Sequence, residues 1–139
     1  MQVINGLSFR SLQYYVIARK WTSDLGFFDF ECSFLHSLIA DFVKRFNEDH
    51  ALRSLMDMLN QLNRLDKDLK NTEQILYQQT RQLELMAEDI IPENSQALAG
   101  KQVELEYMMA DITARFRRLK AELYNLLSSS MTDIKYVTD

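Results

Sequence analysis

The sequence predicts an all-α protein, a long antiparallel up-down-up three-helix bundle with coiled-coil-like packing. Apolar side chains recur in steps of three and four residues along most of the chain, which is the spacing of one helix face. Three glycines and one proline leave little turn chemistry for a β-rich fold. Two short breaks, near residues 47–49 and 91–95, divide the 139 residues into three segments of similar length. We expect these segments to form a single domain over residues 1–139.

The first helix is expected over about residues 8–46. Ser8 is a suitable N-cap, because its side chain can accept a hydrogen bond from the first turn. Thr22 and Ser23 could instead cap a shorter helix, so two starting points stay open. The apolar row that defines this helix is Trp21, Leu25, Phe28, Cys32, Leu35, Ile39, Phe42 and Phe46.

The second helix is expected over about residues 49–90 and the third over about residues 95–128. Pro92 ends the second helix because its ring prevents the regular backbone hydrogen bond. Asn94 or Ser95 can then cap the third helix. Connections this short require neighbouring helices to run antiparallel.

The three serines that begin at Ser128 weaken the apolar pattern of the third helix. We therefore expect residues 129–139 to form a loose tail. At a rise of 1.5 Å per residue, all three helices are roughly 50–65 Å long, which makes them suitable neighbours in one bundle.

Composition argues against several classes of partner. The net charge of −4 argues against nucleic acid. Cys32 is the only cysteine, so no intrachain disulfide can form and a reducing compartment is expected. The first 20 residues lack the basic leading region of a signal peptide, and no run of 18 apolar residues occurs. We expect a cytoplasmic protein that does not bind membranes.

The sequence also lacks the usual patterns of catalytic and metal sites. A di-iron bundle needs Glu-x-x-His motifs, but neither His36 nor His50 has a glutamate three residues before it. The glycines are isolated and form no phosphate-binding loop. Cys32 falls in the apolar row, where a buried structural thiol is expected. The sequence therefore predicts a protein that is not an enzyme and holds no cofactor or metal.

Aromatic residues are concentrated in the first helix, where six of the eight phenylalanines lie between Phe27 and Phe46. Phe27 and Phe34 form a second arc beside the apolar row, and Phe30 lies further round the helix. One interpretation is a wide core face. The other is that Phe27, Phe30 and Phe34 extend past the core and bind a partner protein or a second subunit.

The expected function follows from the second interpretation: a non-enzymatic bundle that acts through protein–protein interaction or self-association, with another protein or a second copy in a homodimer as its partner. The end of the second hairpin near Pro92 would add to the docking surface, and would protrude uncovered if the first helix began only at Trp21. The alternative is a bundle that holds a small apolar ligand or a metal between its helices.

Three acidic residues lie at or beside core positions, where an unpaired charge is costly. Glu31 lies between the two arcs of the first helix, and Asp66 and Glu73 fall in the core row of the second. With a turn near Asn94, antiparallel pairing places Glu73 level with Arg115. The same pairing brings Asp66 near Arg118. We therefore expect interhelical ion pairs that fix the register of the bundle, formed by Glu31, Asp66, Glu73, Arg115 and Arg118.

The segment Trp-Thr-Ser-Asp-Leu-Gly-Phe-Phe-Asp-Phe-Glu-Cys-Ser-Phe-Leu, residues 21–35, resembles a pattern in uncharacterised small helical-bundle proteins of Bacteroidetes-type bacteria. The resemblance covers residues 14–127, including two further long helices. It implies the three-helix fold and no particular activity. That pattern often carries histidines along the second and third helices, where this chain has Gln78, Thr80 and Tyr107. The resemblance therefore implies no metal site here.

Overall fold

The structure is a computed structural model that describes the backbone of residues 6–45 and 49–138, and the side chains of residues 6–45 and 50–129. It contains three helices: α1 (Phe9–Arg45), α2 (Asp49–Ala87) and α3 (Ser95–Thr138). No strand occurs in this part of the chain. The predicted all-α three-helix bundle is confirmed.

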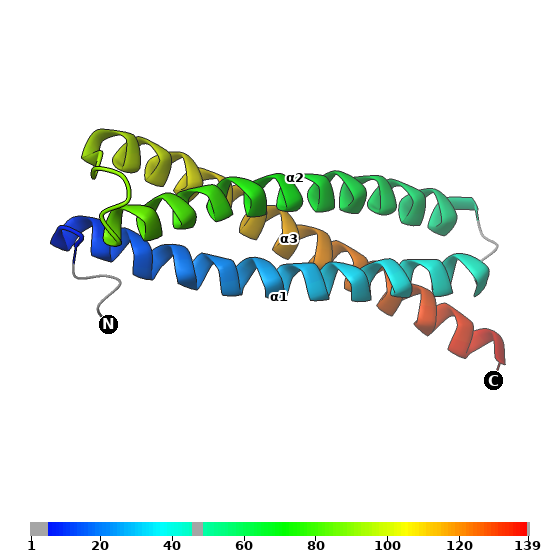
Figure 1. The fold of residues 1–139 in the computed structure, drawn as a ribbon. Helices are drawn as coiled ribbons and strands as arrows, with labels where there is room; N and C mark the ends of the chain where they lie inside the picture. The colour runs from blue at the N-terminus through cyan, green and yellow to red at the C-terminus, as the bar shows by residue number, and fades with distance from the viewer. Residues whose placement is uncertain (1–5, 46–48, 139) are drawn as a thin grey trace.

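The helices run up, down and up, as the colours in Figure 1 show. α1 and α2 lie side by side along most of their length, and α3 crosses them obliquely. Contacts are extensive between α1 and α2 and between α2 and α3, and fewest between α1 and α3. One side of α1 is therefore left uncovered.

α1 begins at Phe9, as the Ser8 cap predicts. The Ser8 Oγ accepts a hydrogen bond from the Ser11 backbone N–H at 3.2 Å. Thr22 does not start a shorter helix. Its hydroxyl donates to the Ala18 carbonyl at 2.9 Å, one turn back within the same helix.

α2 ends at Ala87, before the expected boundary at residue 90. Asp89 takes a φ of 58°, a left-handed conformation that reverses the chain. The Leu85 carbonyl then accepts hydrogen bonds from the N–H groups of Ile90 and Ile91, at 2.9 and 3.4 Å. These bonds satisfy the end of the helix before Pro92 is reached.

Of the two predicted caps of α3, Asn94 forms the contact: its Oδ1 accepts from the Ala97 N–H at 3.1 Å. α3 then continues to Thr138, so the expected helix end at residue 128 is ten residues early, while the loose hold on residues 129–139 stays a prediction. The serine run weakens the apolar stripe, but it contains no glycine or proline that would stop a helix.

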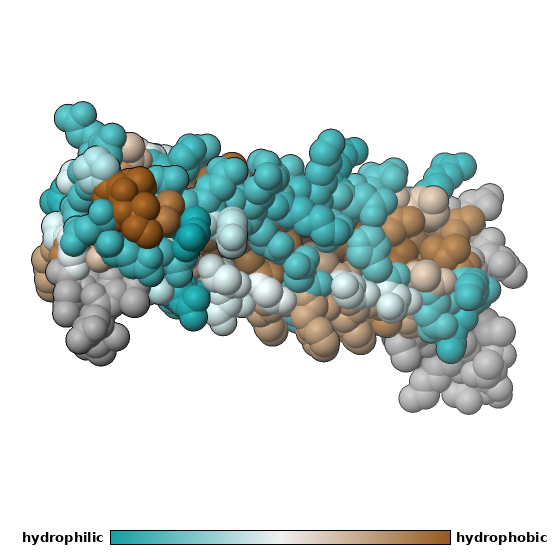
Figure 2. Space-filling view, in the orientation of Figure 1, coloured by the Kyte–Doolittle hydropathy of each residue, from teal (hydrophilic) through white to brown (hydrophobic). Residues whose placement is uncertain are grey.

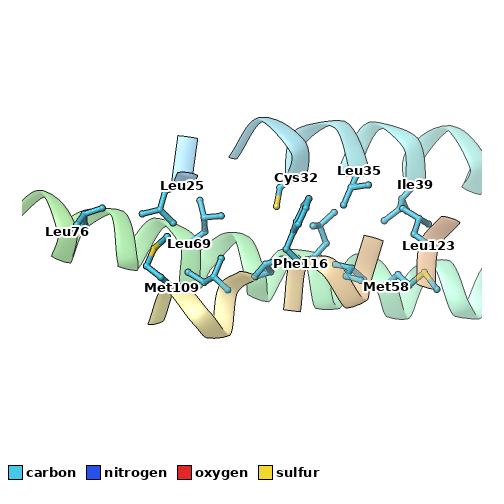
Figure 3. Packing of buried hydrophobic residues seen from close by; sticks show 14 of the residues in the cluster. Leu25, Cys32, Leu35, Ile39, Met58, Leu69, Leu76, Met109, Phe116 and Leu123 are labelled. Atoms are coloured by element: carbon cyan, nitrogen blue, oxygen red, sulfur yellow. The ribbon is translucent and has the colours of Figure 1, made fainter. Parts of the chain in front are cut away.

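All three helices contribute to the main core. In Figure 3, Leu25 of α1 lies beside Leu69 of α2, and the Phe116 ring of α3 rises toward Cys32 of α1. The Phe28 ring packs against Phe116 with centroids 5.1 Å apart. The sequence row that contains Leu25, Cys32, Leu35 and Ile39 is therefore the buried face of α1.

A second, smaller core closes the end of the bundle at the α2–α3 connection. Leu83, Met86 and Leu98 are buried there against Leu7 and other residues near the start of α1. Gly6 lies so close to α2 that a Cβ on it would be 2.6 Å from the Ala87 carbonyl oxygen. The first turns of α1 therefore pack onto this connection.

Glu93 joins the same connection to α1. Its two carboxylate oxygens accept hydrogen bonds from the Ser8 N–H at 3.0 Å and the Ser11 hydroxyl at 2.9 Å. These bonds lower the pKa of Glu93, the Ser8 N–H most strongly. The hairpin end near Pro92 therefore packs against the start of α1, so the condition for its protruding uncovered, a first helix that begins only at Trp21, is not met. Ile90 and Pro92 are exposed, and a role of this end in docking stays a prediction.

Within the described residues, no helix has the length and apolar character needed to cross a membrane.

Candidate functional site: an exposed aromatic stripe on α1

Three phenylalanines stand on the outer surface of α1. Phe27, Phe30 and Phe34 are 57%, 73% and 47% exposed. Their spacing of three and four residues places them in one line along the helix. We call these three residues the aromatic stripe. The rings lie outside the buried core, as expected if Phe27, Phe30 and Phe34 extend past it. That they bind a partner stays a prediction.

Only one edge of the stripe contacts the core. The Phe27 ring lies 6.1 Å from the Phe28 ring, centroid to centroid, and Phe28 contacts Phe116 of α3. Phe30 is the most exposed of the three and lies furthest from this contact around the helix. The aromatic stripe therefore contacts the core on its Phe27 side and is exposed to solvent on its Phe30 side.

The same face continues toward the N-terminus of α1. Val16 and Phe9 are 60% and 76% exposed, and they precede Phe27 by 11 and 18 residues. Both intervals are close to whole numbers of helical turns. Sequence reasoning did not include these two residues, although the intervals would have found them.

Elsewhere in the described residues the exposed large apolar side chains are more widely spaced, apart from Val103 and Tyr107, which lie one turn apart on α3. In Figure 2, a light-brown band runs over the middle of α1, while mostly hydrophilic surface covers α2. Isolated apolar residues on a surface are ordinary, whereas a contiguous row is not. The scattered residues are Met56, Tyr77, Ile90, Val103, Tyr107 and Tyr124.

Glu31 forms an interhelical ion pair, as predicted, and its partner is Lys120 of α3. The Lys120 Nζ lies 2.8 Å from the Glu31 carboxylate. It also lies 5.7 Å from the centroids of the Phe116 and Tyr124 rings. The hydrogen bond to Glu31 raises the pKa of Lys120. This pair ties α1 to α3 beside the aromatic stripe.

Arg115 also forms an ion pair between two helices, but the prediction that Glu73 is its partner is wrong. The Arg115 guanidinium lies 2.6 Å from Asp68 of α2 and 3.0 Å from Asp111 of its own helix. The prediction placed the chain reversal at Asn94. Residues 68 and 115 are equally far along the chain from a point between residues 91 and 92, so the chain reverses earlier than predicted. The early end of α2 is the reason, and it changes which residues of α2 and α3 lie level with each other.

The predicted pair between Asp66 and Arg118 is not formed. Asp66 lies 3.3 Å from Lys70 on its own helix. Arg118 is exposed and lines a groove of about 410 Å³ between α2 and α3, together with Arg64 and Arg115. Asp66 lies on the α1 side of α2, where its charge raises the pKa of the Cys32 thiol, and this orientation keeps it away from Arg118.

Glu73 faces α1 rather than α3. Its Oε1 is buried without a hydrogen-bond partner in the described residues, and the carboxyl group meets Asp29 of α1. Burial, then the hydrogen bond and repulsion from Asp29, raise the pKa of Glu73 to about 7, and Asp66 adds to this. Lys70 acts in the opposite direction. Glu73 therefore keeps its proton to a higher pH than an exposed glutamate does.

Asp29 and Glu73 line a groove of about 510 Å³ between α1 and α2, which we call the α1–α2 groove. Its walls combine charged and apolar side chains, and Gly26 leaves open space along it. No cluster of three metal-ligating side chains occurs here or elsewhere in the described residues. The groove is lined by Arg19, Thr22, Leu25, Gly26, Asp29, Glu73, Leu76, Tyr77, Thr80 and Glu84.

Cys32 is buried in the main core. Burial, with added repulsion from Asp66, Asp29 and Glu31, raises the pKa of the thiol to about 11. Cys32 is thus held as a neutral thiol, which is a poor nucleophile.

Compared with protein-family models, with curated proteins and with solved structures, the chain matches none of them.

Proposed function

We propose that this chain is a non-enzymatic helical bundle that works by binding protein through the aromatic stripe. The observation that carries the proposal is the exposure of Phe27, Phe30 and Phe34 in one line on the outer face of α1. Burying one such ring in an interface contributes up to about 1.5–3 kcal/mol. Contiguous exposed apolar side chains of this kind usually mark an interaction site.

The shape of the surface favours a protein partner over a small molecule. Small-molecule sites are concave and enclose most of the ligand. The aromatic stripe stands on the convex outer side of one helix, where a second helix or a shallow groove of another protein can cover it. Buried aromatic side chains also carry much of the binding energy in protein interfaces.

The direct test is photo-cross-linking in the cells that make the protein. A photo-reactive amino acid replaces Phe30 in one variant and Tyr107 of α3 in another; the second side chain is 75% exposed and lies off the stripe. We expect a protein adduct at position 30 and none at position 107. No adduct at position 30, or equal adducts at both positions, would count against the proposal.

A second candidate function is the binding of a small apolar molecule, and the α1–α2 groove is the observation in its favour. With about 510 Å³ and walls that include Leu25, Leu76 and Tyr77, it could hold a small molecule with an apolar body. Native mass spectrometry of the purified chain tests this: a bound molecule of fixed mass supports it, and the mass of the chain alone rejects it.

A further inference from the structure

We propose that the aromatic stripe binds a second copy of this chain, with the two α1 helices antiparallel across a two-fold axis near Phe30. This inference rests on the proposed function and names the partner of the same surface. In a two-fold interface, each residue of one copy faces a set residue of the other, and the relation holds in both directions. The stripe can therefore be tested for self-complementarity.

The aromatic residues are self-complementary in one antiparallel register. When Phe27 faces Phe34 of the second copy, Phe34 faces Phe27 in return. The axis then passes between residues 30 and 31, and the two Phe30 rings meet beside it. All three rings of each copy are covered at once, including Phe30 with its 73% exposure.

The charges on this face agree with the same register. Lys20 lies seven residues before Phe27 and Asp41 lies seven residues after Phe34, which is two turns in each case. Both are exposed and flank the stripe at its two ends. The register that stacks the rings therefore sets Lys20 opposite Asp41 of the second copy, twice by symmetry.

A parallel arrangement loses this complementarity. It places Lys20 beside Lys20 and Asp41 beside Asp41, so like charges meet at both ends. Asp41 lies 3.3 Å from Arg45 on its own helix, but both side chains are more than half exposed, and such a pair rearranges at little cost. The charge pattern thus selects the antiparallel dimer.

Room for close approach exists between the rings and the charges. The antiparallel register places Ser23, which is exposed, opposite the half-buried Leu38 of the second copy. A small hydroxyl side chain facing an aliphatic one lets the two helices come together without a clash. The contact runs from Lys20 to Asp41, about 30 Å along α1.

The experiment is a charge-reversal cycle, with the dissociation constant of the dimer measured by sedimentation. Lys20→Glu and Asp41→Lys are each expected to raise it about tenfold, because each reversal turns two attractions into repulsions. The double variant is expected to return to within about threefold of the wild type. Lys67→Glu, an exposed reversal on α2, is the control and leaves the constant unchanged.

The outcomes separate this inference from the proposed function. Single reversals without effect, or a double variant that does not recover, would exclude the antiparallel register. A wild-type chain that stays monomeric at every concentration would exclude the second copy as partner. If the photo-reactive residue at position 30 then captures a different protein, the proposed function stands and only this inference fails. If it captures nothing, both fail.

Discussion

At the scale of single residues, Glu73 is the side chain whose charge depends most on the fold. It faces Asp29 across the α1–α2 groove, and burial, with the hydrogen bond and repulsion from Asp29, raises its pKa from 4.5 to about 7. The folded state therefore holds the Glu73 proton more tightly than the unfolded chain does. The stability that this proton provides is complete below about pH 4.5 and is lost as the pH rises to about 7.

Glu73→Gln imitates the protonated carboxyl, since its amide N–H can donate to Asp29. We expect the variant to match the wild type near pH 4.5 and to be more stable by about 1–2 kcal/mol at pH 8. Chemical denaturation across this pH range measures the difference. Glu106→Gln, at an exposed site on α3, controls for the loss of one charge. A difference in stability between Glu73→Gln and the wild type that stays constant with pH would refute the raised pKa of Glu73.

The charged residues also show how far sequence reasoning reaches at this scale. The place of Glu31 between the two arcs and the antiparallel pairing of Arg115 identified both as members of interhelical pairs, and both form one. The partners were missed because they depend on where the chain reverses. A left-handed Asp89 ends α2 early, and no periodic pattern predicts this conformation. Glu73 was assigned to α3 because its level along the bundle does not show which of the two neighbouring helices it faces.

At the scale of helices, three glycines give a matched comparison. Gly6 packs against Ala87, so Gly6→Ala is expected to destabilise the fold by about 1–3 kcal/mol. Gly26 and Gly100 lie within helices, and an added Cβ meets nothing within 4 Å. Gly26→Ala and Gly100→Ala are therefore expected to stabilise it by about 0.5–1 kcal/mol.

Thermal or urea unfolding of the three variants gives the comparison directly. A neutral Gly6→Ala would mean that the chain before α1 does not pack on the end of α2. A destabilising Gly26→Ala would mean that the open space along the α1–α2 groove is needed by the fold.

Helix starts were more predictable than helix ends. Ser8 and Asn94 were both identified as caps, because capping depends on a short side chain and the residues next to it. The end of α3 was placed ten residues early. The apolar pattern weakens at Ser128, but a helix stops only where its backbone hydrogen bonds are interrupted.

At the scale of the whole molecule, helical spacing and two short connections were sufficient to predict the three-helix bundle. They did not decide whether the aromatic segment belongs to the core or to an interface, because Phe27 and Phe34 border the core face of α1. The angle at which α3 crosses α1 and α2 decides which side of α1 is covered. This crossing angle depends on packing between all three helices. The covered side includes Phe28, and the aromatic stripe lies outside it.

The most direct measurement is sedimentation equilibrium of the wild type, Phe30→Asp and Tyr107→Asp over a range of concentrations. We expect a wild-type dimer, a Tyr107→Asp dimer of similar affinity, and a Phe30→Asp dissociation constant raised more than about 100-fold at unchanged helicity. A monomeric wild type, or a Phe30→Asp variant that dimerises normally, would contradict the claim that the aromatic stripe holds two copies of this chain together.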